Sequence, residues 1–147
     1  GTGGAVAMAM KKTSGDSVFV LNGDTLSKIS FNEMSVQHDN NIADATIAVK
    51  FMKDASRYGT VEVGKTGRIK NFIEKRISKG FINTGVYIFS RKWFHSVIPD
   101  EISFSLEQDV LEKGLKNSAL YAFQSEGYFI DIGIPKDYHR AQKEIIL

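Results

Sequence analysis

The sequence contains no cysteine among its 147 residues, so it has neither a disulfide framework nor a metal site built from thiolates. Long aliphatic runs are also missing. The longest near the start, AVAMAM (5–10), is far too short to cross a membrane, and no basic stretch precedes it as in a secretory signal. No block of like charge occurs, which argues against a nucleic-acid partner. We therefore expect a cytoplasmic protein that binds neither nucleic acid nor membrane.

What the sequence does contain is typical of a globular protein, with 42% hydrophobic and 24% charged residues. The length suits one domain, and the net charge of +2 is compatible with a phosphate-bearing ligand without demonstrating one. Helical and strand-like segments alternate along the chain, which favours an α/β fold. We expect helices at 3–12, after Ser105 and from Pro135, and strands at 17–22, 43–52, 60–64, 68–75, 80–90, 119–123 and 127–133.

The stretch VFVLNGDTL (18–26) changes abruptly from apolar to polar. The continuous apolar run Val18–Leu21 fits a strand that is covered on both faces, as in a parallel sheet, although four such residues also suit a buried helix. Gly23 would allow a sharp turn, which would place Asp24 at the carboxyl edge of the sheet, where open α/β folds bind ligands. The alternative interpretation, a simple polar turn, stays open for this stretch alone.

Seven motifs in order resemble those of the sugar-1-phosphate nucleotidyltransferases. They are GTGGA (1–5), LNGD (21–24), RYGTVEV (57–63), FIEK (72–75), INTGVYIF (82–89), FSLEQD (104–109) and FIDIGIPKDY (129–138). The resemblance implies a Rossmann-like fold of the GT-A type, with a mixed, mostly parallel central sheet and flanking helices. The ending FIDIGIPKDYHRAQ is most similar to the branches of the family that make GDP-heptoses and GDP-mannose.

This resemblance implies nucleotidyl transfer from a nucleoside triphosphate, here GTP, to a heptose or mannose 1-phosphate. Asp24 and Asp131 resemble the two family aspartates that bind Mg²⁺, which prefers carboxylates together with water and phosphate oxygens. Taken alone, Asp131 is better explained as a turn residue ahead of Gly133, and it is the order of the family motifs that favours the metal.

Several further residues match positions that contact the sugar phosphate in the family. Glu74 is implied to accept hydrogen bonds from sugar hydroxyls, and Lys75 to neutralise the phosphate as a catalytic residue. The alternative for this pair is an exposed ion pair at a strand end. The remaining sugar-contacting positions are Gly59, Asn83, Thr84 and Gly85.

The nucleotide half of the site is represented by fewer residues. Gly3 and Gly4 resemble the segment that approaches the base, although a loop before a helix explains them almost as well. Asn22 and Gly23, beside Asp24, complete the implied nucleotide-binding set. Glu107 and Asp109, in the FSLEQD motif, are interpreted as mainly structural.

One family feature is missing. Members begin with a strand, a glycine-rich loop whose arginine holds the triphosphate, and a lysine between prolines, and none of these occurs here. We therefore expect residues 1–147 to be the C-terminal portion of one nucleotidyltransferase domain, inactive in isolation and open to oligomerisation. The alternatives are a non-catalytic sugar-phosphate or nucleotide-binding module and an inactive fragment. A glycosyltransferase is disfavoured because no Asp-x-Asp motif occurs.

Overall fold

The structure is a computed structural model that describes residues 1–73 and 79–145. In chain order its elements are α1 (Thr2–Met10), β1 (Ser17–Leu21), β2 (Thr25–Ser27), α2 (Phe31–Asn40), β3 (Ala45–Met52), β4 (Thr60–Val63), β5 (Ile69–Ile73), β6 (Gly80–Ser90), α3 (Arg91–Val97), the π-helical η1 (Leu106–Glu112), the 3₁₀-helical η2 (Leu115–Asn117), β7 (Leu120–Gln124), β8 (Phe129–Asp131) and α4 (Pro135–Glu144).

The main sheet has the strand order β5-β4-β6-β3-β7, and β1 pairs with β6. Along one edge β6 pairs with β3, and it also pairs with β4 at Phe81–Ile82 and with β1 at Val86–Ser90. The predicted mixed sheet with flanking helices is confirmed, but the expectation of mostly parallel pairing is wrong. Within the described residues only β3 and β7 run parallel, because short connections such as the β4–β5 hairpin return the chain antiparallel.

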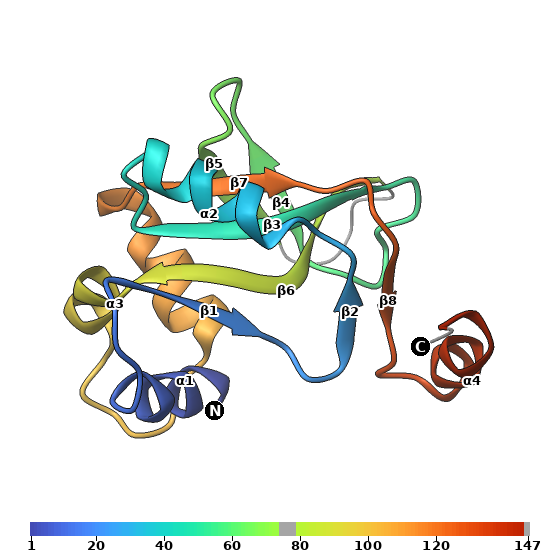
Figure 1. Cartoon of the computed structure of the whole chain (residues 1–147), viewed down its shortest axis with the longest axis horizontal. Helices are drawn as coiled ribbons and strands as arrows, with labels where there is room; N and C mark the ends of the chain where they lie inside the picture. Colours follow the sequence, from blue (N-terminus) through green and yellow to red (C-terminus); the bar gives the residue numbers. More distant parts are fainter. Residues whose placement is uncertain (74–78, 146–147) are drawn as a thin grey trace.

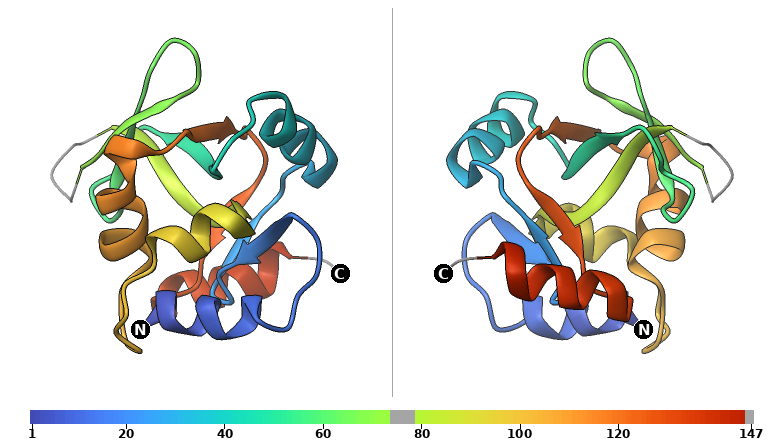
Figure 2. Two further views of the ribbon diagram at one scale, coloured as in Figure 1. Left: turned by 90° about the vertical axis from the view of Figure 1, so that its left-hand side faces the viewer. Right: turned by 90° about the vertical axis from the view of Figure 1, so that its right-hand side faces the viewer.

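Helices cover both faces of this sheet (Figures 1 and 2). On one face α1, α3 and η1 pack against the larger core cluster, in which Tyr87 and Phe89 of β6 are fully buried. On the other face Met34 of α2 packs against Val86 and Ile88, the alternate residues of the same strand. This alternation follows from the two-residue period of a strand. It explains why the sequence of β6 is apolar almost throughout.

The strand β1 is less enclosed than its apolar sequence predicts. Phe19 packs on the α2 side and Val18 and Val20 pack on the opposite side, but all three are only partly buried. Leu21 is 53% exposed. Within the described residues, β1 has β6 as its strand partner, and that pairing is antiparallel. The strand therefore lies at an edge of the sheet and not in a parallel centre.

A small second sheet lies beyond the end of β1, where β2 and β8 pair antiparallel with Thr25 opposite Asp131 (Figure 1). Two hydrogen bonds attach it to β6. The Asn22 amide donates to the Gly85 carbonyl at 2.8 Å, and the Thr25 hydroxyl donates to the Thr84 carbonyl at 3.1 Å. The chain then turns into α4. This arrangement brings the polar end of β1 beside residues that follow it by more than a hundred positions in the sequence.

The ends of the helices agree with the sequence where it carries capping residues. Ser105 accepts a hydrogen bond from the Gln108 amide at the start of η1, and Pro135 lies in the first turn of α4, both as predicted. No helix was predicted for the segment that forms α2, whose composition is mostly polar. In the described ranges no helix has the length and apolar character needed to cross a bilayer.

Candidate functional site

The site begins where β6 passes from one neighbour to the next. Residues 83–85 lie between the part of β6 that pairs with β4 and the part that pairs with β1. Gly85 has φ +77°, and a Cβ atom there would lie 2.7 Å from Asn22 Nδ2 and 2.8 Å from Thr25 Oγ1. Glycine is required for both reasons, since a side chain would be strained and would displace the polar end of β1.

Two carboxylates, Asp24 and Asp131, line a small cavity of about 170 Å³ at this point. Their backbones are held side by side, because the Asp24 carbonyl accepts a hydrogen bond from the Ile132 amide at 3.0 Å. The Asp131 carboxylate accepts one from the Gly133 amide at 2.7 Å. We call this space the acidic cavity. Its lining residues are Asn22, Asp24, Thr25, Tyr58, Asn83, Gly85, Tyr87, Glu107, Phe129 and Asp131.

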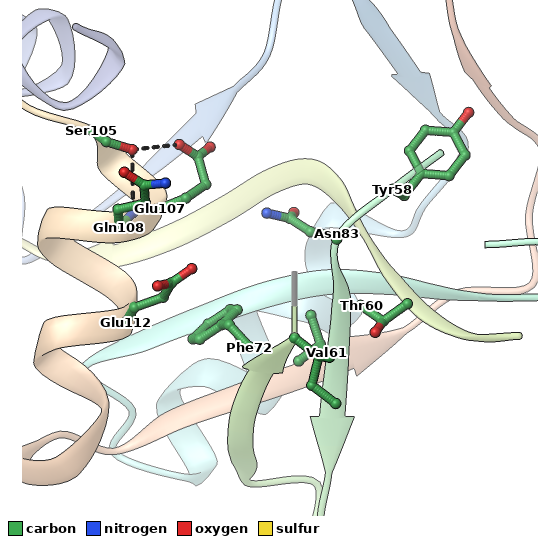
Figure 3. A pocket seen from close by; sticks show the side chains of 11 residues that line it. Tyr58, Thr60, Val61, Phe72, Asn83, Ser105, Glu107, Gln108 and Glu112 are labelled. Atoms are coloured by element: carbon green, nitrogen blue, oxygen red, sulfur yellow. Dashed lines mark hydrogen bonds between the residues drawn. The ribbon is translucent and has the colours of Figure 1, made fainter. Parts of the chain in front are cut away.

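A larger cavity of about 880 Å³ adjoins the acidic cavity and shares Tyr58, Asn83 and Glu107 with it. Figure 3 shows that Glu107, Gln108 and Glu112 come from η1 and that Asn83 comes from β6, whereas β4 and β5 supply an apolar side with Val61 and Phe72. We call it the large cavity. It is lined by Tyr58, Gly59, Thr60, Val61, Phe72, Ile73, Asn83, Ser105, Glu107, Gln108 and Glu112.

A chain of hydrogen bonds fixes the boundary between the two cavities. The Asn83 amide nitrogen donates to the Tyr87 hydroxyl at 2.8 Å, and this hydroxyl donates to Glu107 Oε1 at 3.4 Å. Ser105 donates to the other Glu107 oxygen at 3.3 Å. Burial raises the pKa of Tyr87, and the nearby Glu107 carboxylate raises it further, so this phenol acts as a neutral hydrogen-bonding group. The network orients an amide and a carboxylate toward any ligand.

Tyr58 closes the opposite side of both cavities. Its ring packs edge-to-face against Phe129 of β8, with the centroids 5.9 Å apart, and partial burial raises the pKa of its phenol. The preceding residue, Arg57, donates to Asp137 of α4 at 2.6 Å. This hydrogen bond raises the pKa of Arg57 and lowers that of Asp137, so both remain charged.

Comparison with known proteins gives this geometry a context. The sequence profile described as Nucleotidyl transferase matches residues 1–146. The chain belongs to the nucleotidyl transferase family. It is 46% identical over 99% of its length to D-glycero-alpha-D-manno-heptose 1-phosphate guanylyltransferase of Aneurinibacillus thermoaerophilus, and 36% identical over 95% to the enzyme of that name from Campylobacter jejuni.

A solved structure of HddC from Yersinia pseudotuberculosis resembles the fold, with a TM-score of 0.86 and 32% identity over 98% of the chain. A second HddC structure, complexed with GMP-PN, has a TM-score of 0.84. The chain spans only 60% to 63% of the length of these relatives and solved structures.

The structure brings together many of the residues that the family resemblance singled out. The predicted site residues that line one or both cavities are Asn22, Asp24, Gly59, Asn83, Gly85 and Asp131. They come from the β1–β2 connection, the start of β4, the break in β6 and the end of β8. Residues from four separate segments therefore converge, although their individual roles stay predictions.

Other predicted residues lie elsewhere. Gly3 and Gly4 lie inside the first turn of α1, where side chains would collide with Phe104 and with the Ile102 carbonyl, so close packing explains both glycines. The Thr84 hydroxyl turns away from the cavities and donates to a β3 carbonyl.

Gly23 is not among the lining residues of either cavity. Gly23 lies in the exposed turn before Asp24, in open space. Glu74 and Lys75 lie outside the described residues.

Tyr58, Tyr87 and Glu107 were not predicted as site residues. For Tyr87 a signal was present, because residues 83, 85 and 87 share one face of a strand by its two-residue period. Glu107 carried no such signal, since its place depends on how η1 packs.

The acidic cavity fits a divalent cation in its donor chemistry. Asp24 and Asp131 supply carboxylate oxygens, and the Asn22 and Thr25 side chains add neutral oxygens. Across residues 1–73 and 79–145, no group of three or more His, Cys, Asp or Glu residues is placed to hold a metal ion. A hard cation such as Mg²⁺, which completes its shell with water and substrate phosphate, is compatible with this limited set.

Proposed function

We propose that the chain is the part of a sugar-1-phosphate guanylyltransferase that binds the sugar phosphate and the metal ion. The overall reaction converts GTP and a sugar 1-phosphate into a GDP-sugar and pyrophosphate. The observation that carries this proposal is the pair of acids at the ends of β2 and β8, in a cavity that shares three lining residues with the adjoining large cavity.

In the proposed reaction an oxygen of the sugar phosphate attacks the α-phosphorus of GTP, and the bond to pyrophosphate breaks. Asp24 and Asp131 would hold Mg²⁺, which offsets the negative charge that gathers around the reacting phosphorus. The large cavity would hold the sugar, with Asn83 and Glu107 as hydrogen-bonding groups fixed by Tyr87 and Ser105. Such fixed groups favour reaction by alignment, because the protein contributes no covalent step.

The relatives favour a heptose phosphate as the acceptor. The heptose 1-phosphate guanylyltransferase of Aneurinibacillus thermoaerophilus is 46% identical to the chain, whereas the mannose-1-phosphate guanylyltransferases of Drosophila melanogaster and Arabidopsis thaliana are 34% and 36% identical. The complex of HddC with GMP-PN supports a guanine nucleotide as the donor. We therefore expect GTP with a D-glycero-D-manno-heptose 1-phosphate to be the preferred pair, with mannose 1-phosphate second.

The test is pyrophosphate release by the protein encoded by the complete reading frame. Four nucleoside triphosphates are each combined with heptose, mannose and glucose 1-phosphates in the presence of Mg²⁺. The proposal predicts turnover that requires both substrates and is fastest with GTP. Binding of either substrate without pyrophosphate release in any combination would instead establish a non-catalytic binding module.

A matched pair of variants tests the assignment of the acids. Asp131→Asn removes one charge from the acidic cavity, whereas Asp16→Asn removes one from an exposed residue that lines neither cavity. We expect only Asp131→Asn to raise the Mg²⁺ concentration needed for half-maximal turnover. An equal response of both variants would refute the metal assignment.

A further inference from the structure

An ion pair joins two distant parts of the chain next to the site. Arg57 Nη1, in the loop between β3 and β4, lies 2.6 Å from Asp137 Oδ2 in the first turn of α4. The Asp137 side chain is 6% exposed, so little water competes with this contact. Every other ion pair found in the described ranges joins residues three or four positions apart. This pair therefore constrains tertiary structure in a way that the others do not.

On the loop side, the ion pair is adjacent to residues that touch both cavities. Tyr58 lines both cavities and Gly59 lines the large one, but Arg57 lines neither. The Arg57 guanidinium also lies over the Tyr58 ring, 5.5 Å from its centroid. Because Arg57 contacts Tyr58, a shift of Arg57 would move the wall that Tyr58 contributes to both cavities.

On the helix side, the ion pair is close to one of the proposed metal ligands. Asp131 is the last residue of β8, and Asp137 lies in the first turn of α4, the next element along the chain (Figure 1). The small β2–β8 sheet is not part of the main sheet and is attached to it by individual contacts. One of them is the hydrogen bond from Lys50 of β3 to the Gly127 carbonyl, at 2.6 Å. The ion pair adds a charged attachment beside the cavities.

We propose that Arg57 and Asp137 are a positioning pair for nucleotidyl transfer. The pair holds Tyr58 and Gly59 at a fixed separation from Asp131, and thereby aligns the sugar phosphate with the α-phosphate of the nucleotide. This proposal rests on the function proposed above. Neither Arg57 nor Asp137 lines a cavity. Replacing either one would therefore misplace a substrate without removing a direct contact to it. A misplacement of about 1 Å is enough to lower a rate roughly 100-fold.

The test compares two arginines that contact the same carboxylate. Arg57→Gln breaks the attachment between loop and helix. Arg140→Gln breaks a contact of 3.1 Å to Asp137 from within α4, and the two arginine side chains are similarly exposed, at 44% and 47%. In the complete protein we expect Arg57→Gln to lower kcat/KM for the sugar phosphate by about 10- to 100-fold. Arg140→Gln should stay within about twofold of the wild type, as expected when a residue away from the site is changed.

Three further measurements separate positioning from general loss of structure. Arg57→Lys, which keeps the charge, should recover part of the lost kcat/KM. The double variant Arg57→Gln/Asp137→Asn should be no worse than the poorer single variant, because residues that act as one unit are non-additive. The affinity for GTP without sugar phosphate, measured by calorimetry, should change by less than about threefold in Arg57→Gln. The affinity for the sugar phosphate should fall by more than about threefold.

Several outcomes would overturn the proposal. They are an Arg57→Gln variant as active as the wild type, equal losses in Arg57→Gln and Arg140→Gln, or single-variant losses that multiply in the double variant. If Arg57→Gln unfolds at the assay temperature, Arg57→Lys is compared with Arg140→Gln in its place. A wild-type protein without turnover would refute the proposed function. The positioning pair would then be judged by calorimetric sugar-phosphate binding alone, and unchanged binding in Arg57→Gln would refute it.

Discussion

Replacing Gly85 with alanine probes the break in β6 on which the whole site depends. The new methyl group would sit at φ +77°, within 2.8 Å of Asn22 Nδ2 and Thr25 Oγ1. A left-handed conformation costs a residue with a Cβ about 1–2 kcal/mol. Overpacking typically adds about 1–3 kcal/mol, and the smaller entropy of the unfolded alanine chain offsets about 0.4–1 kcal/mol. We expect a net loss of about 2–4 kcal/mol in the free energy of unfolding, within the usual range for such changes.

Urea unfolding provides the measurement, because the single tryptophan, Trp93, is buried in the core and reports its exposure by fluorescence. Gly23→Ala is the matched control. Its Cβ atom would have no atom within 4 Å, so its stability should change by less than about 1 kcal/mol. If Gly85→Ala were as stable as Gly23→Ala, the close approach of β6 to the β1–β2 connection would be wrong, and with it the convergence of the cavity residues.

Four other predictions follow from the sequence and the structure. Asp24→Asn in the complete protein should preserve folding and lower turnover about 100-fold, or about 2.7 kcal/mol of barrier, measured by pyrophosphate release. Lys75→Ala should raise KM for the sugar phosphate, and an effect confined to GTP would contradict its assignment. Burial lowers the pKa of His38. Its folded form therefore resists protonation, and stability should fall as the pH drops below about 6.5, a dependence that His38→Gln should lack. Residues 1–147 alone should release no pyrophosphate, and light scattering should reveal self-association through β1, whereas full activity from a monomer would contradict both expectations.

The sequence predicted most strands because their apolar patterns carry the information locally. The strand at 80–90 was placed within its observed bounds, and the hairpin at 64–68 was marked by its glycines. The direction of the strands could not be predicted as well. A strand that is buried on both faces has the same continuous apolar sequence in a parallel and in an antiparallel sheet. The expectation for Val18–Leu21 failed for a related reason. Apolar composition shows that a strand meets the core but not whether it lies at an edge.

The residues of the candidate site also fall into those that the sequence predicted and those that depend on tertiary packing. Asp24 stood out because a polar turn follows an apolar strand, whereas Asn83 and Asp131 were predicted from the family motifs that contain them. Tyr58 and Glu107 reach the cavities through tertiary packing of a loop and of η1, which no local pattern records. Gly3 and Gly4 show the converse. The family resemblance suggested that they approach the nucleotide base, but close packing of α1 against residues 102–104 accounts for them.

The pairing of β2 with β8 has a consequence for the order of folding. Thr25 lies opposite Asp131, so the two proposed metal ligands can meet only after the chain has been synthesised through β8. Closing a loop of this length is entropically costly and slow compared with forming a helix or a hairpin. The main sheet can assemble first, leaving Asp24 without its partner until β8 docks. A ligand that bridges both acids would stabilise the docked form by mass action, so Mg²⁺ with a nucleotide should protect β8 and α4 from proteolysis more than the core strands.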